Sequence, residues 1–132
     1  MMRYMLIAKA TQESEQGCTL KPELMAAIGR LTEEMTRAGT LLEVGGLAPT
    51  SKGARLVLSD GRVTVTDGPF AEAKEVIGGY AIVQVESKAE AVELSRRFLQ
   101  LHADLLGPSY EAESEVRQFF DPSEYALEPA NR

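Results

Sequence analysis

The stretch GGYAIVQVES (residues 78–87) holds the two signals that decide the fold. Its alternating positions are apolar on both sides, which predicts a strand whose two faces are both covered. It runs directly into SKAE (87–90), a capping box in which a serine and a glutamate satisfy backbone N–H groups at the start of a helix. The helix should end near Leu106, because Gly107-Pro108 cannot continue it.

The segments before this strand continue the pattern. RYMLIAKA (3–10) predicts a first strand that is also apolar on both faces, and a polar loop follows it. A helix is expected from Pro22, which suits a first helical position, to Gly39, which suits a left-handed C-terminal cap. LLEVGGLAP (41–49) indicates a weaker strand, in which Gly45-Gly46 suggests a bulge or a close backbone approach.

A hairpin interrupts the order of these elements. ARLVLSDGRVTVTDG (54–68) contains two alternating runs around Asp60-Gly61, the usual signal of a two-residue type I′ turn. EAESEVRQFF (111–120) predicts the last strand, and we expect residues 121–132 to form a loosely packed tail after a single domain of residues 1–120. Without the hairpin the order is β-α-β-β-α-β, which predicts an α+β protein with the ferredoxin-like split βαβ fold.

The two predicted helices can cover only one face of such a sheet. The first strand and the strand at 78–87 are nevertheless apolar on both faces. A second copy of the sheet is the economical cover, so we expect a symmetric homodimer of the dimeric α+β barrel type. The alternative is a monomer whose hairpin folds back over the open face.

The bulk composition limits the possible partners. The chain has 132 residues and a net charge of -6, which disfavours nucleic acid and anionic membranes because both repel acidic proteins. The apolar run in MMRYMLIAKATQ (1–12) is too short to span a bilayer and lacks a signal-peptide cleavage site. Cys18 is the single cysteine and lies in a polar stretch, which favours a reducing compartment, and we expect the cytoplasm.

A second Asp-Gly pair, at Asp67-Gly68, is followed at once by Pro69 and Phe70. Proline cannot pair as an ordinary hairpin strand requires, so a turn leading into a short helical segment, FAEAKE (70–75), is expected. Two interpretations remain. Asp67 caps that turn and does nothing more, or Phe70 forms the wall of a pocket whose charge Asp67 supplies.

The stretch DGPFAEAKEVIGGYAIVQVES (67–87) closely resembles the signature of the YCII-related proteins, in particular the subfamily named for its Asp-Gly-Pro-Phe (DGPF) motif. The resemblance extends to residues 3–10, to the helix after Pro22 and to EVR (115–117), and covers about residues 1 to 120. It implies a ferredoxin-like fold that dimerises through its sheets. Some members are encoded beside extracytoplasmic-function sigma factors, and related members have been proposed to be enzymes.

The resemblance also implies a His-Asp pair whose histidine lies in the first half of the chain, and this sequence departs from that pattern. Its single histidine is His102, which falls within the buried arc of the second helix beside Phe98. His102 is therefore either a hydrogen-bonded core residue or a general acid or base whose pKa is tuned by partial burial. Arg117 shares a strand face with Glu113 and Glu115, so it forms a cross-strand ion pair or binds the carboxylate or phosphate of a ligand.

These patterns lead to two classes of function. The first is a small cytoplasmic homodimer that binds a small organic molecule between helices and sheet or at the dimer junction. As an enzyme it would transfer protons without a cofactor, in an isomerase- or lyase-like step, with Asp67 or His102 as the base; no spacing resembles a metal site. The second is a non-catalytic interaction module, accessory to sigma-factor signalling, which would expose a sizeable apolar patch. The residues expected to line the ligand site are Asp67, Gly68, Pro69, Phe70, Tyr80, His102 and Arg117.

Overall fold

The computed structural model describes residues 1–17, 20–70 and 75–121. Cys18, most of the predicted helical turn at 70–75 and the tail from residue 122 lie outside the described residues. The elements in chain order are β1 (Met2–Lys9), α1 (Gln12–Glu15), α2 (Pro22–Arg37), β2 (Leu41–Gly46), the 3₁₀ turn η1 (Thr50–Lys52), β3 (Ala54–Ser59), β4 (Arg62–Asp67), β5 (Ile77–Val85), α3 (Lys88–Leu106) and β6 (Ser114–Gln118).

Four strands form the main sheet in the order β2-β5-β1-β6, and every neighbouring pair is antiparallel. β1 and β2 therefore run parallel to each other with β5 between them, which is the split βαβ arrangement. The ferredoxin-like α+β fold predicted from the sequence is confirmed. The hairpin of β3 and β4 forms a separate two-stranded sheet, as its insertion between β2 and β5 requires.

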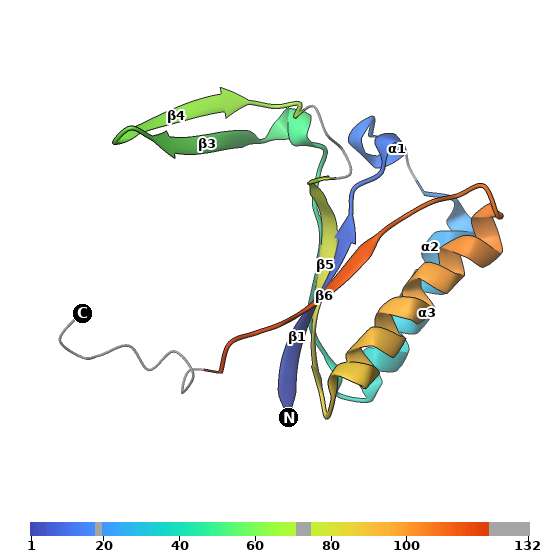
Figure 1. Cartoon of the computed structure of the whole chain (residues 1–132). Coiled ribbons are helices and arrows are strands. Elements are labelled where there is room, and N and C mark those ends of the chain that lie inside the picture. Colours follow the sequence, from blue (N-terminus) through green and yellow to red (C-terminus); the bar gives the residue numbers. More distant parts are fainter. Residues whose placement is uncertain (18–19, 71–74, 122–132) are drawn as a thin grey trace.

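Both long helices pack against one face of the sheet (Figure 1). The core between the layers contains Tyr4, Val83, Val85 and Ala91, and Leu6, Leu94 and Val116 pack around it. Burial of these side chains supplies the main driving force for folding, at about 25 cal/mol per Å² of apolar surface.

The helix limits follow from local chemistry. α2 begins at Pro22 as predicted, and Gly39 beyond its end has a φ of 74°. At the start of α3 the Ser87 side chain accepts a hydrogen bond from the backbone N–H of Glu90. The Glu90 carboxylate accepts from the N–H of Glu86, one residue earlier than an ideal capping box would place it.

Three limits differ from the sequence-based expectation. The polar loop after β1 contains the single helical turn α1, capped by Thr11 and Ser14 through reciprocal hydrogen bonds. β2 ends at Gly46 and β6 covers only Ser114–Gln118. Single backbone hydrogen bonds continue beyond these limits, from Leu47 to Gly78 and between β1 and residues 113 and 119.

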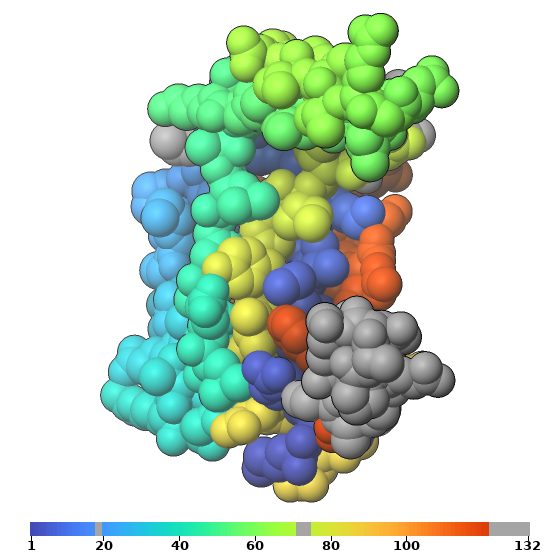
Figure 2. All heavy atoms as spheres, turned by 90° about the vertical axis from the view of Figure 1, so that its left-hand side faces the viewer, coloured from blue at the N-terminus to red at the C-terminus, as the bar shows by residue number. Residues whose placement is uncertain are grey.

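The hairpin leaves one end of the main sheet and projects on the side away from the helices (Figure 1). Its turn at Asp60-Gly61 has φ values of 53° and 73°, which confirms the predicted type I′ geometry. Every residue of both its strands is exposed, so the hairpin does not fold back over the sheet. The open face of the sheet, seen in Figure 2 below the hairpin, is therefore not covered by it.

None of the helices in the described part of the chain is long and apolar enough to cross a membrane.

Candidate functional site

The DGPF turn, residues 67–70, packs directly on the 3₁₀ turn η1. The Gly68 N–H donates to the carbonyl of Gly53 at 3.0 Å, and the Gly68-Pro69 peptide bond is cis. A Cβ atom at Gly68 would lie 1.7 Å from the Thr50 carbonyl oxygen, so only glycine fits here. The first role of the motif is therefore close backbone packing at the base of the hairpin.

A chain of hydrogen bonds continues from this turn to α1. The backbone N–H of Phe70 donates to Oγ1 of Thr50 at 2.9 Å, and that hydroxyl in turn donates to the carboxylate of Glu15. The Thr50 N–H donates to the other oxygen of the same carboxylate at 3.0 Å. Glu15 and Thr50 could not be identified from the sequence, because no local pattern shows that they meet.

In the DGPF turn, the Phe70 side chain is half-buried, whereas the Asp67 side chain is exposed. The guanidinium of Arg55 lies over the half-buried Phe70 ring, 4.1 Å from its centroid, in a cation–π contact. Asp67 is the exposed last residue of β4, and its carboxylate makes no hydrogen bond or ion pair within the described ranges. The N–H groups of Gly68 and Phe70, just ahead of Asp67, donate to Gly53 and Thr50 and not to its carboxylate, whereas those of residues 71–74 lie outside the described residues.

Tyr80 lies on the open face of the sheet and leans toward β2. Its hydroxyl donates to the carboxylate of Glu43, which raises the pKa of the Tyr80 phenol, and burial and the charge of Glu43 add to that increase. Its ring occupies the space where a Cβ atom at Gly45 would be, 2.9 Å from the nearest ring atom. Gly45 thus marks a close approach by a side-chain ring, whereas the expected close approach was of backbone, and a Cβ atom at Gly46 would have nothing within 4 Å.

Three charged side chains lie on the other side of the same face. Nζ of Lys9 lies 2.9 Å from Oε2 of Glu115, whereas Nη1 of Arg117 lies 3.5 Å from Oε1. The hydrogen bond from Lys9 lowers the pKa of the Glu115 carboxyl, and the same bond raises the pKa of Lys9. The contact of Arg117 to Glu115 runs along β6 and is not the cross-strand ion pair that was expected for Arg117. The cross-strand partner of Glu115 is Lys9, at the shorter distance, so among the described residues the Arg117 guanidinium keeps free donors.

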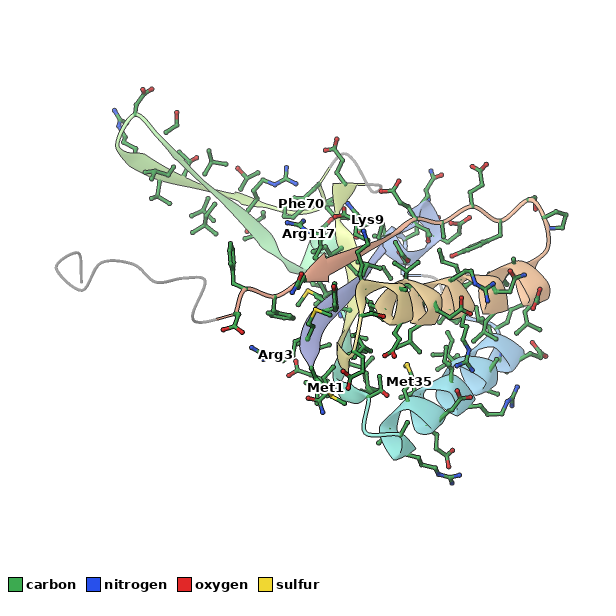
Figure 3. The ribbon with its side chains drawn as sticks, turned by 60° about the horizontal axis from the view of Figure 1, so that its bottom comes forward. Met1, Arg3, Lys9, Met35, Phe70 and Arg117 are labelled. Carbon is green, nitrogen blue, oxygen red and sulfur yellow. The ribbon has the colours of Figure 1, made fainter. Side chains whose placement is uncertain are left out.

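The strand register shows how the two sides are related. Glu43, Ile82, Met5 and Arg117 form one row across β2, β5, β1 and β6, and Gly45, Tyr80, Ile7 and Glu115 form the next. Apolar side chains therefore separate the Tyr80–Glu43 pair from the Arg117 cluster by roughly two strand spacings, about 10 Å. Figure 3 labels Lys9 and Arg117, which share Glu115 as their partner, and Phe70 at the base of the hairpin.

His102 lies in the other layer. It is buried on α3, its Nδ1 donates to the Phe98 carbonyl oxygen at 2.9 Å, and its ring stacks on Tyr110 with centroids 5.6 Å apart. Since α3 covers the face opposite Tyr80 and Arg117, the sheet separates His102 from them. The structure thus brings Tyr80 and Arg117 onto one face, with the DGPF turn at the base of the hairpin, and leaves His102 in an aromatic cluster of the core layer.

Concave surface also occurs on the outside of the helices. A shallow groove of about 440 Å³ between α2 and α3 is lined by Arg30, Glu34 and Arg97 among others. Arg97 forms a bidentate pair with Glu34 at 2.7 and 2.9 Å, which lowers the pKa of the Glu34 carboxyl. This pair joins the two helices and leaves neither charge free. Across the described residues, no group of three His, Cys, Asp or Glu side chains could hold a metal ion.

Comparison with known proteins agrees with the fold and identifies the family. The YCII-related domain matches residues 2–105, a range that includes the DGPF turn, Tyr80 and His102 and ends before Arg117. An uncharacterised protein from Rhizobium meliloti (strain 1021) is 36% identical over 73 residues, which cover 55% of this chain and 59% of that protein. The chain therefore spans little more than half the length of this relative in the match. By the extent of the domain match, the chain belongs to the family of proteins with a YCII-related domain.

Proposed function

We propose that the protein is a homodimer whose two copies meet through the open faces of their sheets and bind a small organic anion between them. The observation that supports this best is the composition of that face. The half-buried Met5 and Ile82 form an apolar centre beside the buried Ile7, while a tyrosine–glutamate pair and an arginine lie on either side of it. Apolar area on a sheet face drives association, and polar groups at its margins give a ligand its orientation.

Arg117 favours an anionic ligand. Its side chain is 70% exposed and its contact to Glu115 is long, so its planar fork can hold a carboxylate or phosphate through two parallel hydrogen bonds. The apolar part of such a ligand would lie on Met5 and Ile82, toward Tyr80. Phe70 and Pro69 at the base of the hairpin would close one end of the space that holds the ligand. Residues 67–70 support assignment to the DGPF subfamily within the YCII-related proteins.

The reaction that we assign to this site is a cofactor-free proton transfer of isomerase or lyase type. Asp67 is its base, because the carboxylate is exposed and unpaired among the described side chains. Asp67 would take a proton from a carbon next to a carbonyl group and return it to a neighbouring position. His102 lies on the helix side of the sheet, so within this proposal it is a core residue.

Sedimentation velocity tests the dimer. At micromolar concentration we expect a particle of twice the 14.4 kDa chain mass. Ile82→Lys places a charge at the centre of the apolar face and should yield monomers that remain folded. Val92→Lys changes an exposed position on the outside of α3 and should leave the dimer intact. A monomeric wild-type protein would overturn the proposal.

Nuclear magnetic resonance tests the site with a set of small aliphatic carboxylates and keto acids as probes. Binding should shift the signals of Ile82 and Met5, and Arg117→Gln should abolish it, whereas Arg62→Gln on the hairpin should not. In D₂O, a bound keto acid should exchange its α-hydrogen for deuterium, and Asp67→Asn should stop that exchange while His102→Gln leaves it. Binding without hydrogen exchange would support the ligand site and contradict the catalytic role of Asp67. Binding that Arg117→Gln does not affect would overturn both the ligand site and that catalytic role.

A second function is favoured by one observation, the exposed apolar face of the hairpin. An interaction module, such as an accessory to sigma-factor signalling, needs a surface of this kind for a protein partner. That function would be supported if the hairpin proved dispensable for the dimer and for ligand binding, while its replacement abolished the protein's biological effect.

A further inference from the structure

The β3–β4 hairpin has two chemically different faces. The register pairs Leu56 with Val65 and Leu58 with Val63, so these four side chains share one face. Their exposed fractions are 64%, 63%, 72% and 60%, in that order. The opposite face carries Arg55, Thr64 and Thr66 together with the single apolar residue Val57. The hairpin thus presents a compact apolar surface to its surroundings.

A surface of this kind needs a partner. An isolated two-stranded hairpin is at best marginally stable in water, because it lacks a layer on which to bury its apolar side chains. Within the described ranges, the contacts that anchor it lie at its base, where Gly68 bonds to Gly53 and Arg55 covers Phe70. Soluble proteins rarely expose clustered apolar side chains without a partner, and these four are all more than half exposed among the residues that the structure describes.

The direction of the hairpin indicates where the partner lies. It projects from the end of the main sheet on the side opposite the helices, which is the side of the open face (Figure 1). Six residues of β3 extend over roughly 20 Å, whereas two sheets packed face to face lie about 10 Å apart. In a face-to-face dimer the hairpin is therefore long enough to pass the whole partner sheet.

We infer that the hairpin is an intermolecular arm whose apolar face, Leu56, Leu58, Val63 and Val65, packs on the second copy of this chain. The inference rests on the proposed homodimer and extends it. The second copy is the favoured occupant because the arm continues the proposed sheet interface and points into the space that the partner must fill. The base of the arm carries the DGPF turn, so the arm also closes the end of the ligand space, and the site is incomplete in a single chain.

The dimer dissociation constant provides the test. The double variant Leu56→Thr/Val65→Thr makes the apolar face polar while keeping residues that suit strands. It should raise the dissociation constant by at least about tenfold, because each substitution occurs twice in a two-fold dimer. The control Val57→Thr makes the same kind of change on the opposite face of β3 and should leave the dissociation constant within about twofold, since surface substitutions away from contacts have small effects.

A second measurement remains informative if the double variant is misfolded. In wild-type protein mixed from ¹³C-labelled and unlabelled chains, filtered nuclear Overhauser effects should connect the methyl groups of Leu58 and Val63 to the other copy. A dimer that Ile82→Lys dissociates but the arm variant does not, with no such effects, would overturn the arm and leave the proposed dimer standing. That outcome would assign the apolar face to a foreign protein. A monomeric wild-type chain would overturn both proposals.

Discussion

At Gly68 there is no space for even a methyl group. The atom that a Cβ would meet is the backbone oxygen of Thr50, which cannot rotate away as a side chain could. We therefore expect Gly68→Ala to lower the free energy of unfolding by about 3 kcal/mol, as overpacking against rigid backbone does. Urea denaturation measures this change.

Gly29 provides the matched control. It lies in α2, is exposed, and a Cβ there has nothing within 4 Å. Gly29→Ala should increase the stability by about 0.5–1 kcal/mol, because alanine loses less entropy in a helix. An unchanged urea midpoint for Gly68→Ala would show that the DGPF turn can move away from η1, contrary to the packing described above.

The Lys9–Glu115 ion pair should make stability depend on pH at both extremes. The pKa of Glu115 is lowered by Lys9, so its contribution is present above the ordinary value of 4.5 and is lost as the pH falls through the lowered value. The pKa of Lys9 is raised by Glu115, so its contribution is present below 10.5 and is lost as the pH rises through the raised value. The ion pair therefore contributes to the free energy of unfolding at every pH between these two limits.

Urea midpoints of the wild type and Glu115→Gln give the measurement. The two proteins should differ at pH 7 and converge as the pH falls below 4.5. The effect should be small because both groups reach solvent. Glu111→Gln removes an exposed carboxylate without an ion pair among the described residues and should follow the wild type at every pH. A difference that persisted in strong acid would assign the effect of Glu115→Gln to packing and contradict an ion pair.

Among the elements, the smallest ones fix the position of the hairpin. The hydroxyl of Thr50 in η1 accepts from Phe70 and donates to Glu15 in α1, so it joins three segments that lie far apart in the sequence. Thr50→Val keeps the shape and removes both bonds. Since it leaves the Phe70 amide without its partner and the Glu15 carboxylate with only the backbone N–H of residue 50, we expect a loss of about 1–3 kcal/mol. Urea denaturation measures the loss, and Ser51→Ala at the exposed neighbouring position should have little effect.

The elements that were predictable from the sequence are those whose signals are local. Pro22 starts α2, Ser87 caps α3, and Asp60-Gly61 forms the hairpin turn, because each residue acts within a few positions of itself. α1 was missed because a four-residue turn buries no apolar face and leaves no periodic pattern. Its significance lies in Glu15, whose partner is 35 residues away.

For the whole molecule, the strand order followed from the element order, but the site did not. Lys9 and Glu115 meet because β1 and β6 are neighbours in a particular register, and Tyr80 meets Glu43 across another pair of strands. Alternation placed Arg117 and Glu115 on one face correctly, since a strand's period is local. It could not show that His102 and Tyr80 lie on opposite sides of the sheet, because that depends on which face the helices cover.

The two sheets of the chain should also differ in how they exchange amide hydrogens. Among the described strands, β3 and β4 pair only with each other, so in a monomer we expect the hairpin to open without disturbing β1 and β5, whose amides should exchange on global unfolding. At concentrations where the dimer dissociates, amides of Ala54–Ser59 and Arg62–Asp67 should therefore exchange much faster than those of Ile77–Val85. At concentrations where the dimer forms, the hairpin amides should approach the protection of the main sheet, because opening then requires the arm to leave its partner.

Hydrogen exchange measured at a series of protein concentrations tests whether the protection of the hairpin depends on the dimer. Hairpin amides that are equally protected at every concentration would show that the hairpin is stable without a partner, and amides that stay unprotected in the dimer would show that its apolar face packs on nothing there.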